Sequence, residues 1–183
     1  MFFINPFIYA GGGDFESIAT VTVGSGGASN IEFTSIPSTY QHLQIRAILM
    51  GTDGSDWRSA YIRVGNGSID TGSNYAYHTL GGNGSSAFAG GAASQSFGLA
   101  GYATSSTNIP GPTLLDILDY GSTSKTKTLR CLTGSERNAT PSELLLTSTL
   151  WNSTSAIDTI RLYPSGGSFR QYSTAALYGV KAP

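Results

Sequence analysis

Ten short runs of β-favouring residues constrain the fold of this chain more than any other feature. The runs are rich in apolar, β-branched and aromatic residues, and Gly, Pro, Ser, Asn or Asp bounds each of them. Their ranges are 18–23, 30–36, 42–50, 59–64, 74–80, 114–120, 127–132, 143–151, 156–163 and 173–180. Short strands at this spacing are typical of an all-β sandwich or barrel.

Helical periodicity is nearly absent. The best helical candidate, residues 114–120, is a short run between Pro112 and Gly121. Several of the runs instead alternate apolar and polar residues, as strands with one buried face do. No helices alternate with the strands, which disfavours a doubly wound α/β fold. We therefore predict an all-β fold, with a single jelly-roll-like β-sandwich over residues 14–183.

The first 13 residues differ from the rest of the chain, because large apolar side chains crowd into nine positions before three glycines, 11–13. Exposed to water, such a segment would be prone to aggregate. It is either an extra strand that folds back onto the sandwich or an arm that docks on a neighbouring subunit, with the glycines as a hinge. The candidate docking residues are Phe2, Phe3, Ile4, Phe7, Ile8 and Tyr9.

Charged residues make up only 11% of the chain, and 10 basic residues nearly balance 11 acidic ones. The net charge of −1 creates no general attraction to nucleic acid or to an anionic membrane. The first 13 residues are too short to span a bilayer, so no membrane insertion is expected. Weak self-repulsion instead suits a protein that packs against copies of itself.

The sequence contains few of the residues that nucleophilic or metal-dependent catalysis needs. It has two histidines, His42 and His78, and a single cysteine, Cys131, in an apolar run. There is no G-x-S-x-G motif and no zinc-type Cys/His spacing. We expect His42 and His78 to be strand-end or surface residues, and Cys131 to be buried.

Two carboxylate pairs were considered as catalytic or metal-binding candidates. Asp116 and Asp119 are three positions apart, so on a strand they face opposite sides and cannot flank one glycosidic bond. Asp53 and Asp56 lack the further oxygen ligands of a calcium loop, which favours a hairpin turn.

The glycine-rich stretch 73–101 begins like a strand and then turns into Gly, Ser and Ala. Its GGNGSS segment has no following lysine and opens no helix, so it does not form a phosphate-binding loop. Its small residues favour close approach of backbones. We predict that the protein is not an enzyme and uses no cofactor or metal.

Aromatic residues offer a weak ligand-binding prediction. Trp57, Tyr75, Tyr77 and His78, together with Trp151 and Tyr163, could form a platform on which a sugar stacks, as aromatic faces pack on apolar sugar faces. Against this stands the common role of tyrosine in β-sandwiches, where it is a half-buried cross-strand partner.

Five stretches carry a resemblance to a known family. They are DFESIATVTVGSGGASNIEFTSIPSTYQHLQIR (14–46), DTGSNYAYHTLGGNGSS (70–86), LLDILDYGSTSKTKTLRCLTG (114–134), LWNSTSAIDTIRLYP (150–164) and FRQYSTAALYGVK (169–181). Together they resemble, in order, a family of small virion structural proteins of tailed phages, common in cyanophages and other aquatic phages. The resemblance implies a β-sandwich on the virion surface, with no catalytic residues to carry over.

The resemblance leaves the place in the particle open. In one placement the protein is a tail-fibre or receptor-binding component, trimeric by analogy, that binds a host cell-surface glycan or protein. In the other it is a capsid decoration (cement) protein that clamps neighbouring capsid subunits through its arm. A glycan-cleaving depolymerase is disfavoured by the small size and the missing carboxylate pair. In each placement the expected partners are other virion proteins and further copies of this chain.

Overall fold

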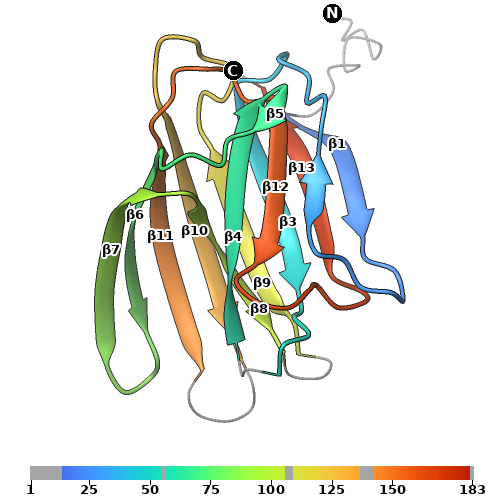
Figure 1. The fold of residues 1–183 in the computed structure, drawn as a ribbon, viewed down its shortest axis with the longest axis vertical. Helices are drawn as coiled ribbons and strands as arrows, with labels where there is room; N and C mark the ends of the chain where they lie inside the picture. Colours follow the sequence, from blue (N-terminus) through green and yellow to red (C-terminus); the bar gives the residue numbers. More distant parts are fainter. Residues whose placement is uncertain (1–13, 55–56, 106–108, 137–141, 182–183) are drawn as a thin grey trace, which may run out of the picture.

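The computed structural model describes residues 14–54, 57–105, 109–136 and 142–181. Within these ranges the chain forms thirteen β-strands and no helix, and so no helix that could cross a membrane. The strands build two antiparallel sheets that pack face to face (Figure 1). The predicted all-β sandwich is confirmed.

The larger sheet has eight strands, and each pairs antiparallel with its neighbours. Their order across the sheet is β1 (Phe15–Thr22), β13 (Thr174–Val180), β3 (His42–Leu49), β9 (Gly111–Ile117), β10 (Lys127–Ser135), β11 (Glu143–Trp151), β6 (Tyr75–Gly82) and β7 (Ala87–Gln95).

The smaller sheet has five strands, and β4 lies at its centre. One edge of β4 pairs with β12, whereas the other edge pairs with both β5 and β8. These strands are β2 (Ile31–Phe33), β12 (Thr159–Pro164), β4 (Trp57–Asn66), β5 (Ser68–Ile69) and β8 (Gly98–Thr104).

Strict alternation in the sequence decides which side chains enter the core. In β3, Leu43, Ile45 and Leu49 are fully buried, whereas Gln44 and Arg46 point to the outer face. Successive side chains on a strand point to opposite faces, so each inward position meets the other sheet. The core is made of these inward positions from both sheets, such as Leu115, Ile117 and Leu129 from the larger sheet and Ile62, Val64, Ile160 and Leu162 from the smaller one.

The two sheets differ in width, and this leaves part of the larger sheet uncovered. β6 and β7 extend beyond the smaller sheet on one side of the sandwich (Figure 1). Side chains on the inner face of β6 therefore meet the edge of the smaller sheet instead of its middle. This overhang brings β6 beside the turn between β7 and β8.

β8 lies unusually close to the larger sheet. It contains two glycines and two alanines, and a Cβ built on Gly101 would collide with Thr113 and lie 2.9 Å from the Thr133 hydroxyl oxygen. A Cβ on Gly98 would likewise collide with the Thr149 methyl group. The inner face of β9, β10 and β11 is lined at this point by buried hydroxyl side chains: Thr113, Thr133, Ser135, Thr147 and Thr149. Small residues on one strand and threonines on the facing sheet allow this close packing.

The structure resolves three expectations about local elements. The run 114–120 follows the strand prediction and not the helical alternative, because residues 111–117 form strand β9. The glycine-rich stretch 73–101 forms β6, β7 and most of β8. Its glycines in β8 allow that strand to pack closely against the larger sheet. Cys131 is buried as predicted, and burial raises the pKa of its thiol to about 12.

Gly101 gives a direct test of the close packing of β8. Gly101 has a φ of 119° and no room for a Cβ, so Gly101→Ala should lower the free energy of unfolding by about 2–5 kcal/mol. Gly134 is the matched control, because a Cβ there would only make ordinary contacts with Glu143 and Leu144. Gly134→Ala should change stability by less than about 1 kcal/mol. Urea unfolding of both variants measures the difference, and equal effects would contradict the packing described.

Candidate ligand-binding surface

Tyr75, one of the predicted platform residues, is buried in the core with 1% of its surface exposed. Its hydroxyl accepts the Val64 N–H at 3.0 Å and lies 3.1 Å from the Val64 carbonyl oxygen, to which it can donate. Burial raises the pKa of Tyr75, so this phenol stays neutral. Tyr75 ties β6 to β4 and cannot face a ligand, which corrects the prediction.

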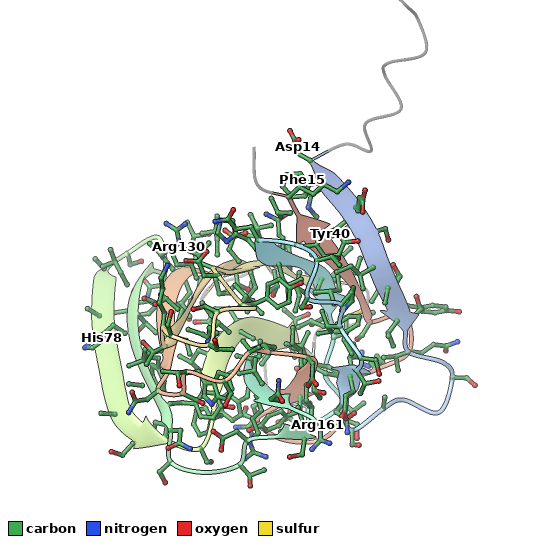
Figure 2. The ribbon with its side chains drawn as sticks, turned by 90° about the horizontal axis from the view of Figure 1, so that it is seen from above. Asp14, Phe15, Tyr40, His78, Arg130 and Arg161 are labelled. Carbon is green, nitrogen blue, oxygen red and sulfur yellow. The ribbon has the colours of Figure 1, made fainter. Side chains whose placement is uncertain are left out.

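Three further predicted residues, Trp57, Tyr77 and His78, do not meet on one surface. Trp57 begins β4 opposite Thr104, at the far end of β4 from the Val64 backbone that Tyr75 contacts; the Trp57 side chain lies outside the described part of the chain. Tyr77 and His78 are adjacent on β6, so they point to opposite faces. His78 is exposed on the outer face of the larger sheet (Figure 2). Of the two remaining platform residues, Trp151 is buried at 2% exposed, and its indole N–H donates to Asp70 at 2.7 Å. Only Tyr77 and Tyr163 join other aromatic rings.

A continuous line of four aromatic rings crosses from the overhanging β6 onto the smaller sheet. We call Tyr77, Phe97, Tyr61 and Tyr163 the aromatic strip. The Phe97 ring stacks on Tyr61 with 3.9 Å between ring centres and lies 6.2 Å from Tyr77. Tyr61 meets Tyr163 edge to face at 5.5 Å. All four side chains are half-buried, so the strip presents partly exposed rings in fixed positions.

Two arginines border the aromatic strip. The Arg63 guanidinium carbon lies 4.9 Å from the centre of the Tyr163 ring, and its Nε donates to the Ser96 carbonyl oxygen at 2.7 Å. This bond holds the β7–β8 turn against β4. Arg161 is paired with Glu32 at 2.9 Å, on the outer face of the smaller sheet (Figure 2). Two cations and one anion leave this border with a net positive charge.

Strand register explains why these residues come together. Tyr61 stands directly opposite Tyr163, and Arg63 stands directly opposite Arg161, in the pairing of β4 with β12. On its other edge, Tyr61 pairs with Leu99 next to a bulge. A bulge increases local twist and can re-aim a side chain. Phe97 precedes β8 directly, so the turn into that strand places its ring on Tyr61.

Burial affects the titration of two phenols of the strip, Tyr61 and Tyr163. It is the main cause that raises the pKa of Tyr61, and it raises the pKa of Tyr163 in the same way. The Tyr163 hydroxyl oxygen is itself buried, so the strip offers mainly its partly exposed aromatic rings beside two guanidinium groups. Flat apolar faces next to hydrogen-bonding and cationic groups are suited to binding a sugar, above all one with acidic substituents.

The sequence carried a signal for part of this surface. The run 59–64 alternates Tyr61 and Arg63 with Ala60, Ile62 and Val64, which marks Tyr61 and Arg63 as outward residues of a half-buried strand. The run 156–163 contains the reverse order, Arg161 and then Tyr163. Nothing in the sequence, however, shows that the two runs pair in the register that aligns these residues.

Among the described residues, no group of three His, Cys, Asp or Glu side chains is placed to hold a metal ion. The carboxylates singled out in the sequence have local partners. Asp116 accepts a hydrogen bond from Gln44 at 2.9 Å, and Asp119 pairs with Lys125 at 2.8 Å. Asp53 pairs with Arg58, whereas Asp56 lies outside the described residues.

His42 also has a structural contact. Its Nδ1 accepts the backbone N–H of Asp119 at 3.0 Å, which fixes the turn after β9 against the start of β3. The predicted docking residues Phe2, Phe3, Ile4, Phe7, Ile8 and Tyr9 lie outside the described residues.

No protein-family model matches this chain, and comparisons with curated proteins and with solved structures find no match either.

A double-mutant cycle can test whether the strip is a coupled unit. Because the Phe97 and Tyr61 rings stack, Phe97→Ala and Tyr61→Ala should show a coupling free energy of about 0.5–1.5 kcal/mol in urea unfolding. Tyr61→Ala combined with Tyr178→Ala is the control, since Tyr178 lies on β13 of the larger sheet. The control pair should be additive within about 0.5 kcal/mol. Additivity in both pairs would contradict the stacked arrangement.

Proposed function

We propose that this protein is a structural component of a bacteriophage virion, exposed on the particle surface as a tail-fibre or receptor-binding component. The resemblance of its sequence to virion proteins of tailed phages supports the virion assignment. The aromatic strip bordered by arginines carries the receptor-binding part. The proposed role is non-catalytic, and the proposed assembly is a homo-oligomer, a trimer by analogy with other tail-fibre modules.

The proposed ligand is a host cell-surface glycan that carries acidic groups. Sugar rings have apolar faces that stack on aromatic side chains, and the strip presents several such rings along one line. Guanidinium groups bind carboxylate or phosphate substituents with directed hydrogen bonds. Arg63 and Arg161 lie beside the strip, where a substituent of a stacked sugar can reach them.

A capsid decoration protein is the second candidate, and one observation favours it. The outer face of the larger sheet exposes several leucines, and residues 1–13 are strongly apolar. Contiguous exposed apolar surface marks sites where proteins assemble. A cement protein would use such surfaces to clamp neighbouring capsid subunits, and it would need no ligand at the aromatic strip.

Receptor binding predicts a loss of adsorption when the strip is altered. A Tyr61→Leu/Tyr163→Leu variant keeps apolar bulk at both half-buried positions but loses the flat rings. Particles that carry it should adsorb to host cells about tenfold or more slowly, because truncating an aromatic anchor costs about 2 kcal/mol or more. Tyr178→Leu on the larger sheet is the matched control and should adsorb normally. Normal adsorption by the double variant, with the protein present in the particles, would exclude the strip as the receptor site.

Labelling of intact particles distinguishes the two placements. With antibodies against this protein, immunogold particles should cluster at the tail if it is a receptor-binding component. Gold spread over the head would overturn the tail placement and support the decoration protein. Purified particles without any label would contradict the virion assignment itself.

A further inference from the structure

The outer face of the larger sheet is apolar at its centre, although it faces solvent. Four leucines stand directly opposite one another across β9, β10, β11 and β6, and we call them the leucine row: Leu114, Leu132, Leu146 and Leu80. Their exposed fractions range from 38% for Leu114 to 60% for Leu80. Scattered exposed leucines are ordinary on a protein surface, but a contiguous row across four strands is not.

A groove runs beside the leucine row and has a volume of about 640 Å³. Its floor is formed where Pro112 and Gly134 lie between two larger side chains, Ile48 of β3 and Leu144 of β11. Gly134 has no side chain to fill this space. The exposed surface of the groove is mostly apolar, although Arg46 and Glu136 also line it, and such a surface suits an apolar occupant.

Polar residues border the apolar area on its other side. The next row across the same face contains Gln44, Asp116, Arg130, Ser148 and His78. A second copy placed face to face on a two-fold axis that lies in the sheet plane and perpendicular to the strands would set this polar row against the groove. Asp116 and Arg130 would then be buried against apolar atoms at a large desolvation cost. The face therefore fits a narrow apolar segment better than a copy in that arrangement.

The chain contains one segment of that kind, residues 1–13. It holds three phenylalanines, two isoleucines and a tyrosine, and it contains no Asp, Glu, Lys or Arg. Its apolar part is short enough to lie along the groove and the leucine row. The same chemistry that makes this segment an aggregation hazard in water makes it complementary to the face.

The point at which this segment joins the sandwich also favours the same face. β1 starts at Phe15, and the Phe15 ring lies on the outer side of the larger sheet, 5.7 Å from the Arg46 guanidinium carbon. Arg46 in turn lies over the Tyr178 ring at 5.3 Å. Figure 2 shows Phe15 on the same side of the sandwich as Arg130, and Arg161 on the opposite side. The preceding residues therefore join the sandwich on this outer side, on β1 and beyond the polar row, which they must cross to reach the leucine row.

The distances allow residues 1–13 to reach the groove of their own subunit. Phe15 is level with His42, and Ile48 lies six residues further along β3, or about 20 Å. Gly134 is four strand spacings from β1, or about 19 Å across the sheet. The direct path is thus about 28 Å, whereas the chain from Phe15 to Ile4 spans about 36 Å when extended. Gly11–Gly13 next to β1 permit the reversal of direction that this path requires.

We propose that residues 1–13 dock on the outer face of the larger sheet of their own subunit, with Phe2–Phe7 over the leucine row and the groove at Gly134. Attachment to the same chain gives the segment a high effective concentration at this face, so a free subunit closes on itself. Copies that are held side by side can exchange such a segment, because each offers an identical docking face. The proposal does not depend on the receptor-binding role.

Disulfide trapping in the full-length chain tests the docking directly. In an Ile4→Cys/Gly134→Cys variant, mild oxidation of a dilute sample should form an intrachain disulfide in most molecules. The product should run as a monomer on a non-reducing gel and show the cross-linked peptide by mass spectrometry. Ile4→Cys/Ser68→Cys is the control, since Ser68 is exposed on the smaller sheet. The control should cross-link at least about tenfold more slowly, because a disulfide needs Cα atoms within about 7 Å.

Each other outcome of the trapping experiment overturns the proposal. Interchain dimers at low protein concentration would place the segment on a neighbouring copy. Equal rates in the test and control variants would show that the segment has no preferred face. Absence of any cross-link would show that it docks elsewhere.

Filling the groove provides a second test that needs no cross-link. Gly134→Leu should place a side chain where the segment docks, while leaving the strand pairing intact. Chymotrypsin should then cleave after Phe2, Phe3, Phe7 or Tyr9 about tenfold faster than in the wild-type chain, because proteolysis follows the undocked population. Gly26→Leu, at a loop position with open space, is the control and should match the wild type. Equal cleavage of all three proteins would contradict docking at the groove.

Discussion

The close approach of β8 to the larger sheet determines how this sandwich is assembled. Gly98 and Gly101 lie against threonine side chains at distances that leave no space for a Cβ. This contact fixes the depth at which β8 sits, and the pairing of β8 with β4 then fixes the position of the smaller sheet. Phe97 immediately precedes Gly98, so the same contact also sets where its ring meets Tyr61.

The two outer faces of the molecule differ in chemistry although both are built from the same alternating pattern. On the smaller sheet, the outward positions hold aromatic rings, two arginines and a glutamate. On the larger sheet, they hold a central row of leucines with polar residues to one side. Such a division suits a protein that contacts its ligand on one face and is covered by apolar chain on the other.

The sequence predicted the fold class because strand patterns are local. Runs such as 42–50 and 156–163 show their buried faces by alternation alone, and Cys131 sits where its apolar neighbours indicated. Strand β7 was hard to predict, since its small residues lack an alternating pattern. It is a strand because its backbone pairs with β6, and this pairing is not visible in the local sequence. The run 114–120 fits a short helix or a strand by spacing alone, and its small length between Pro112 and Gly121 favoured the strand that residues 111–117 form.

The candidate site was harder to predict, because it depends on pairing between distant segments. Tyr75 and Tyr77 look equivalent in the sequence, yet one fills the core and the other lies beneath the overhang next to Phe97. Tyr61 and Tyr163 become neighbours only through the β4–β12 register.

The buried thiol of Cys131 bears on the durability of the molecule outside a cell. Oxidants and alkylating agents attack the thiolate, and burial suppresses that form by raising the pKa of Cys131 to about 12. The sequence has no other cysteine, so the folded protein has no exposed thiol that oxygen or peroxide could oxidise. While the sandwich stays folded, Cys131 is therefore slow to form mixed disulfides.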